Sequence, residues 1–177
     1  IFSVATLVFL RHSTRLNKSF ALFTTFLGLW VLMQFVAQLT HEVAPMVAIA
    51  AFNIALTLPA FFAIEFYHFV LRYCGKLPTT HDAPWRDYII PVIAAVVAFV
   101  PGVLYKGVTL SEAGIVVSGT NPYYVLVLFV AGYVGWGVKD LLYYSRHSIN
   151  REAHYRTKFL LWGVVVAAIT IFGAIVL

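Results

Sequence analysis

Long apolar segments separated by short polar segments dominate this sequence. Each of five segments approaches or exceeds the roughly 20 residues that a helix needs to cross a bilayer core of about 30 Å. An apolar run over residues 1–10 would cover only half of that thickness. The segments are continuous rather than alternating, which favours helices over a barrel. The five predicted spans are residues 19–39, 46–72, 87–104, 123–144 and 159–177.

Two features modify this all-α prediction of a polytopic helical membrane bundle. The long segment 105–122 contains two β-prone runs, 108–110 and 115–117, which predict a short β-hairpin. The chain also begins and ends inside apolar runs, so we expect residues 1–177 to be a single transmembrane domain from a longer protein, with a partial first span.

Composition supports a membrane location. Of the 177 residues, 62% are hydrophobic and 11% are charged, whereas soluble domains carry about 25% charged residues. The net charge is +5, but the basic residues cluster between apolar segments, which is typical of loops beside anionic lipid and not of a nucleic-acid site. The single cysteine, Cys74, excludes an intramolecular disulfide.

The positions of the basic residues predict the orientation. Of the 12 lysines and arginines, all but Lys106 fall in or beside alternate loops on one side of the membrane. The positive-inside rule makes that side cytoplasmic. We therefore expect a multi-pass protein of the inner (plasma) membrane with its N-terminus outside, and the hairpin on the outer face.

Polar residues inside spans are the main functional candidates, because each is costly in lipid unless it has a partner. Span 46–72 carries several on one helical face, and a Gln34–Asn53 contact with the preceding span is plausible. We also predict a buried cluster of Glu65, His68 and Lys139, acting either as a switch or as a structural pair. The candidates for ligand binding or switching are Trp30, Gln34, Gln38, Asn53, Thr57, Glu65, His68 and Lys139.

Catalytic and metal sites are not predicted. The Glu65-x-x-His68 spacing occurs in di-iron bundles, but that chemistry needs a second such motif, and no other predicted span contains a glutamate. The glycine-rich run 132–137 has no Walker lysine and indicates close helix packing instead. We expect no enzyme activity, no cofactor and no metal in this chain.

The order of several motifs resembles the N-terminal seven-transmembrane region of bacterial sensor histidine kinases. They are a basic loop after the first span, a Leu29-Trp30 pair, Pro59 followed by the 69–73 element Phe-Val-Leu-Arg-Tyr, the pair Tyr143-Tyr144, and the basic segment 156–163. The resemblance extends from about residue 11 to residue 177.

This resemblance implies a sensory input module, one further span, and a cytoplasmic output domain such as a histidine kinase outside these residues. It also implies a homodimer, and it assigns no ligand. The alternative is a small transporter, or a membrane subunit of a larger complex, with a proton or solute path at Glu65 and His68.

Overall fold

A computed structural model describes residues 14–77, 85–111, 114–147, 152 and 154–164. The named elements follow one another along the chain, and residues 154–164 form a further helical segment. They are α2 (Arg15–Thr40), α3 (Pro45–Tyr73), the 3-10 helix η1 (Trp85–Tyr88), α4 (Ile89–Val97), β1 (Tyr105–Ser111), β2 (Gly114–Gly119) and α5 (Asn121–His147).

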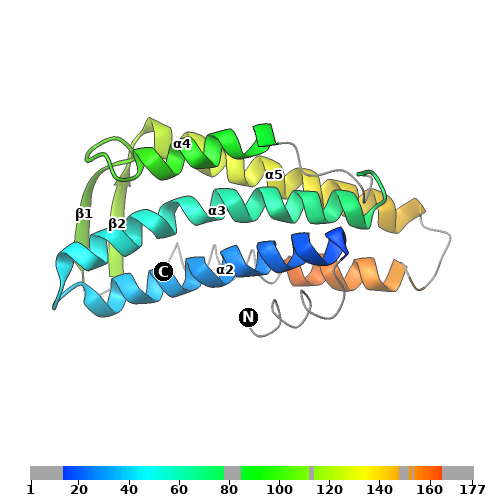
Figure 1. The fold of residues 1–177 in the computed structure, drawn as a ribbon, viewed down its shortest axis with the longest axis horizontal. Coiled ribbons are helices and arrows are strands. Elements are labelled where there is room, and N and C mark those ends of the chain that lie inside the picture. The colour runs from blue at the N-terminus through cyan, green and yellow to red at the C-terminus, as the bar shows by residue number, and fades with distance from the viewer. Residues whose placement is uncertain (1–13, 78–84, 112–113, 148–151, 153, 165–177) are drawn as a thin grey trace.

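Helices α2 and α3 form an antiparallel pair joined by a tight turn (Figure 1). The side chain of Thr14 caps α2 by accepting a hydrogen bond from the backbone N–H of Asn17. Pro45 occupies the first turn of α3, where its missing N–H costs no helical hydrogen bond. Helix α3 then continues past Pro59 as one element.

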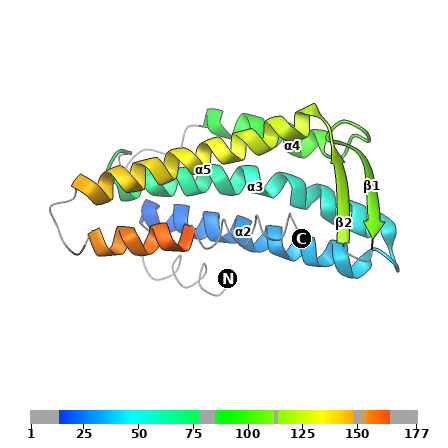
Figure 2. The same ribbon diagram turned by 180° about the vertical axis from the view of Figure 1, so that it is seen from behind.

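Helix α3 is the central element of the bundle. It contacts α2, α4, η1 and α5, and Figures 1 and 2 show it between α2 and the α4–α5 layer. One core cluster joins Phe66, Phe69 and Val70 of α3 to Leu141 of α5. Large apolar side chains of α2, α4 and α5 stay exposed, including Phe35, Ile93 and Leu128. Such surfaces suit a lipid environment.

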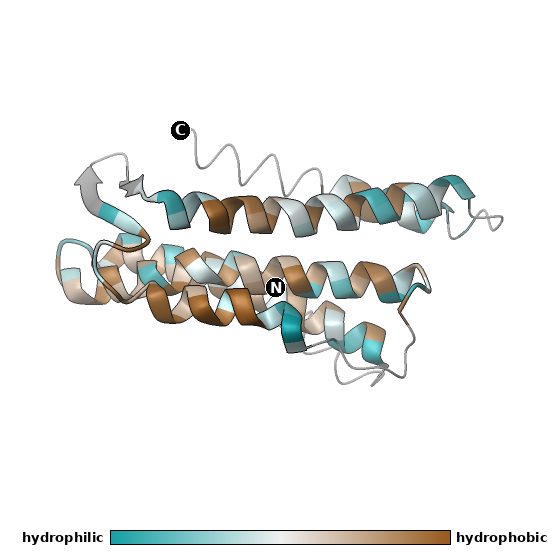
Figure 3. Cartoon of the chain, turned by 90° about the horizontal axis from the view of Figure 1, so that it is seen from above, coloured by the Kyte–Doolittle hydropathy of each residue, from teal (hydrophilic) through white to brown (hydrophobic). Residues whose placement is uncertain are grey.

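Three helices, α2, α3 and α5, are long and apolar enough to cross a membrane. They coincide with predicted spans 19–39, 46–72 and 123–144. Figure 3 shows that α5 is mostly hydrophobic in its first half and carries more hydrophilic positions toward His147. The ends of these helices that carry the basic residues lie together, opposite the strands (Figure 1).

The predicted span 87–104 is not a full-length helix. Helix α4 has nine residues, which cover about 13 Å and therefore fall short of a bilayer core. The chain turns after Val97, and Gly102 adopts a φ of 80° in the turns around Pro101. A left-handed residue cannot continue an α-helix, so the apolar run does not produce a single long element. Span 159–177 is described only to residue 164, and residues 1–10 lie outside the described part.

Strands β1 and β2 pair antiparallel within the segment for which the sequence predicts a hairpin. Their register places Val108 opposite Val117 and Leu110 opposite Ile115. The pair lies at one end of the bundle, beside the α2–α3 turn (Figure 1). We call this the strand end.

The glycine-rich run 132–137 is predicted to allow close helix packing, and in the structure one of its glycines, Gly137, does so. A Cβ on Gly137 would lie 2.7 Å from Cε1 of Phe66, whereas Cβ atoms on Gly132 and Gly135 would meet nothing within 4 Å. Gly137 therefore allows α5 to approach α3, and Gly135 lies on an open face of α5.

Candidate functional site

The polar face of α3 is buried. Asn53, Thr57, Glu65, His68 and Arg72 are each at most 9% exposed. The prediction that these residues share a face is therefore correct, and that face is directed into the bundle. Thr57 satisfies its hydroxyl locally by donating to the carbonyl oxygen of Ile54 at 3.0 Å, which leaves the other four to form contacts between elements.

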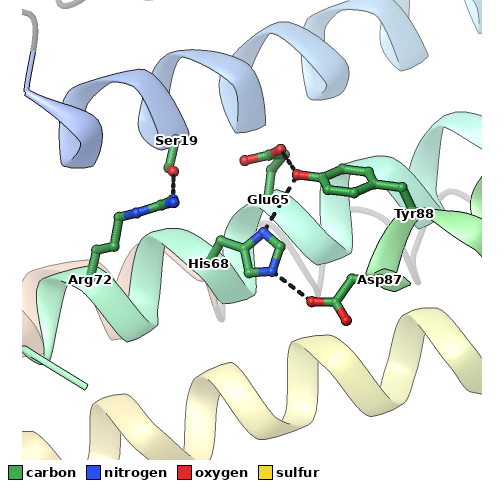
Figure 4. Close-up of polar contacts among 6 residues, drawn as sticks. All are labelled: Ser19, Glu65, His68, Arg72, Asp87 and Tyr88. Carbon is green, nitrogen blue, oxygen red and sulfur yellow. Dashed lines mark hydrogen bonds and ion pairs between the residues drawn. The ribbon is translucent and has the colours of Figure 1, made fainter. Parts of the chain in front are cut away.

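Glu65 and His68 contact η1, which follows α3 after a short connection. The hydroxyl of Tyr88 donates to Oε1 of Glu65. Nε2 of His68 lies 2.8 Å from Oδ2 of Asp87, and Nδ1 lies 3.5 Å from the Tyr88 hydroxyl oxygen. Figure 4 shows Tyr88 between Glu65 and His68, with His68 bridging onward to Asp87. We call these four residues the inner network.

One hydroxyl group is shared within the inner network. Tyr88 has one hydroxyl hydrogen, and when it donates this hydrogen to Glu65, its oxygen can only accept from Nδ1 of His68. Nε2 of His68 in turn lies against Asp87. Tyr88 and His68 therefore connect the carboxyl groups of Glu65 and Asp87 in one chain of polar contacts.

The predicted cluster of Glu65, His68 and Lys139 is wrong in its third member. Lys139 is exposed on α5, and within the described residues Asp87 and Tyr88 supply the partners. The reason is helical phase, because Gly137 and Leu141 of α5 face α3. Lys139 is two residues beyond Gly137, about 200° around the helix axis, and so it points away from α3.

Further contacts tie the end of α3 opposite the strands to its neighbours. Arg72 donates to the hydroxyl of Ser19 on α2 (Figure 4), which ties the two helices together. Beyond the helix, Lys76 forms an ion pair with Asp140 of α5 at 2.6 Å, and this hydrogen bond raises the pKa of Lys76. Burial raises the pKa of the Cys74 thiol to about 11.

At the strand end, Asn53 has a different partner from the one predicted. The hydroxyl of Tyr105, at the start of β1, donates to Oδ1 of Asn53 at 2.7 Å. Ala37 of α2 packs against Ala51 and Phe52 in this region, and within the described residues no hydrogen bond joins Gln34 to Asn53.

The remaining candidates lie outside these contacts. Trp30 and Gln34 are partly exposed and Gln38 is exposed. Within the described residues, the structure does not bring these three side chains of α2 together with the inner network.

Sequence reasoning missed Asp87, Tyr88 and Tyr105. Asp87 and Tyr88 stand at the start of the apolar segment that follows α3 in the sequence. An acid and a phenol at that point were a usable signal for a partner of His68. Tyr105 carried no comparable signal, because its contact with Asn53 depends on how the strands fold over the α2–α3 turn.

Comparisons with known proteins identify no relative. No family model, no curated protein and no solved structure matches the chain. Within the described residues, no group of three histidine, cysteine or acidic side chains is arranged to hold a metal ion. The site therefore has to be interpreted from its own chemistry.

Proposed function

We propose that this chain is a membrane-embedded sensory input module that passes a signal to a cytoplasmic output domain outside these 177 residues. The inner network carries the proposal, because it places four ionisable side chains at the contact between α3 and η1. Buried ionisable groups in a membrane segment are costly and commonly functional. The order of motifs shared with sensor kinases supports the same function.

The proposed mechanism is a shift between two packings of the bundle. Protonation or ligand binding at the inner network changes which hydrogen bonds join α3 to η1. A stimulus that favours one packing increases its population in proportion to its differential affinity. Helix α3 then transmits the change to α2 through Arg72 and Ser19 and to α5 through the Phe66 contact with Gly137.

The proposed topology follows the basic residues. The end opposite the strands faces the cytoplasm, and the strand end faces outward. Two chains would form a homodimer, as in sensor kinases, and the membrane is the bacterial inner membrane.

A small transporter is the second candidate, and one observation favours it. A proton exchanged between Glu65 and His68 through Tyr88 would be a segment of a conduction path. A transporter would need this path to reach both sides of the membrane. At the strand end, the Tyr105 hydroxyl contacts the amide of Asn53, and this contact includes no carboxylate or imidazole that would extend the path.

The test compares signal output with proton flux in the natural protein that carries this chain. Reconstituted into proteoliposomes, it is assayed for autophosphorylation and, with a pH-sensitive dye inside the vesicles, for proton uptake. We expect Glu65→Gln to change autophosphorylation severalfold. Neither the wild type nor this variant should carry a proton flux. The control is Gln34→Ala, which removes a polar span residue outside the inner network and should leave autophosphorylation unchanged. Flux that Glu65→Gln abolishes would establish the transporter, and unchanged output with no flux would refute both functions.

A further inference from the structure

The face of α5 turned away from α3 carries an open groove of about 420 Å³. Its lining residues in the described part belong to α5 alone, and they include Gly135, Lys139, Leu142, Arg146 and His147. They recur at intervals of three or four residues, so they share one side of the helix. The opposite side carries Gly137 and Leu141, which pack against α3.

This groove has a local excess of positive charge. Lys139 and Arg146 are exposed along it. The neighbouring acid, Asp140, is engaged by Lys76, and Glu152 is engaged by Arg156. No ion pair within the described residues reaches Lys139 or Arg146. The groove is therefore complementary to an anion.

The groove also combines aromatic and apolar surfaces. The Tyr143 ring stacks on His147 with centroids 4.1 Å apart, and Nζ of Lys76 lies 5.6 Å from the Tyr143 centroid. Leu142 lines the groove at nearly the level of Tyr143, Val138 lines it about 7 Å deeper, and Gly135 leaves a gap where a side chain would stand. An aromatic ring near the helix end with apolar surface beginning beside it suits the boundary between the headgroup and the acyl chain of a phospholipid.

The position of the cations along α5 fits the same ligand. Arg146 is in the last turn of the helix, and Lys139 lies eight residues before His147, or about 12 Å deeper. A lysine on a lipid-facing surface at that depth extends its ammonium group toward the interface. Lys139 and Arg146 can therefore approach one phosphate from below and from above.

We propose that this groove binds the headgroup of an anionic phospholipid, with an acyl chain along Val138 and Leu142. The inference requires that the chain is in a membrane, but it requires neither a sensory role nor a transport role. A second copy of the chain is a poorer occupant, because two identical cationic faces repel each other.

Native mass spectrometry of the detergent-purified protein tests this inference. The protein is titrated with a short-chain phosphatidylglycerol and, separately, with the matching phosphatidylcholine, and the dissociation constants of the first adduct are compared. We expect the wild type to prefer phosphatidylglycerol. Lys139→Gln with Arg146→Gln should reduce that preference roughly tenfold, since each basic residue contributes substantially to attraction of anionic lipid.

The matched control removes the same charge elsewhere. Lys106 and Lys158 are exposed and do not line the groove, so Lys106→Gln with Lys158→Gln should change the preference less than twofold. The charge-retaining pair Lys139→Arg with Arg146→Lys should keep it, and circular dichroism checks that each variant is folded. An equal loss of the phosphatidylglycerol preference in the groove variant and in the control variant would refute a defined site. A wild type that does not prefer phosphatidylglycerol over phosphatidylcholine would refute it as well. If Lys139→Gln with Arg146→Gln instead dissociated a dimer, the groove would bind a second copy of the chain and not a lipid, and the proposal would be overturned.

Discussion

Two polar residues of α3 are each held by a tyrosine hydroxyl from a later element, yet the two contacts differ in what they can do. At the strand end, Tyr105 donates to the amide of Asn53. At the other end, Tyr88 donates to the carboxylate of Glu65 and also lies beside His68. The Asn53 contact involves no carboxylate or imidazole, whereas the Glu65 contact connects a carboxylate to a histidine through one hydroxyl. We therefore place the proposed switch at Glu65 and not at Asn53.

The largest expected effect comes from His68→Ala. His68 is 1% exposed and engages both Asp87 and Tyr88. Its loss leaves a cavity and an unpaired carboxylate, which should lower the free energy of unfolding by about 2–4 kcal/mol. Thermal unfolding in detergent measures this change. The control His41→Ala, in the loop after α2, should leave the midpoint within a degree or two, and equal effects would contradict the importance of the inner network.

Gly137→Ala tests whether the inner network lies beside a close helix contact. The new Cβ would lie 2.7 Å from Phe66, the residue next to Glu65. Overpacking of this kind costs about 1–3 kcal/mol, and the same unfolding assay should register it. Gly135→Ala adds the same methyl group to open space. If Gly135→Ala were as destabilising as Gly137→Ala, the result would contradict the close packing of α5 on α3 at Gly137.

Removing the two tyrosine hydroxyls compares the contacts directly. Tyr88→Phe and Tyr105→Phe each delete one hydrogen bond to a buried acceptor and should each cost about 1–2 kcal/mol. Only Tyr88→Phe should alter how the unfolding midpoint depends on pH, because the Tyr88 hydroxyl contacts two ionisable side chains, Glu65 and His68, whereas the Tyr105 hydroxyl contacts the amide of Asn53. Midpoints measured from pH 5 to pH 9 separate the two variants, and parallel curves would remove the distinction between the contacts.

The smallest effect concerns Cys74, just after α3 at the end that carries the inner network. Burial raises its pKa from 9.0 to about 11, so the reactive thiolate is scarcer at any pH below that value. At pH 8 we expect alkylation by a maleimide about 100-fold slower than for an ordinary thiol, continuing to accelerate up to pH 10. His41→Cys in a Cys74→Ser background is the exposed reference. Similar rates would show that this end of α3 is open to water.

Helix existence and the buried face of α3 were accessible from sequence, whereas the partners of that face were only partly so. The recurrence of polar residues from Asn53 to Arg72 fixed which of them share a side. Choosing Lys139 as a partner of Glu65 relied on similar depth alone. Depth ignores rotation about the helix axis, and the contact of Gly137 with Phe66 sets that rotation.

For a related reason, the sequence did not reveal that the α-helix within segment 87–104 ends at Val97. Hydropathy reports which residues avoid water, and it does not report whether the backbone can remain helical. Helix α4 ends at Val97, and Gly102 and the turns around Pro101 keep it from resuming. The β-prone runs that follow were visible in the sequence, but the donation from Tyr105 to Asn53 was not, because it joins residues 52 positions apart.

The sequence by itself determined the apolar helices α2, α3 and α5, the clustering of basic residues at one end, and the buried polar face of α3. Each of these depends on local composition and on helical periodicity, which act over a few residues. Only the tertiary structure decided that Tyr88 and Asp87 complete the network of Glu65 and His68, and that Lys139 faces outward. Those outcomes depend on the relative rotation and approach of packed helices, which are set by side-chain contacts between distant parts of the chain.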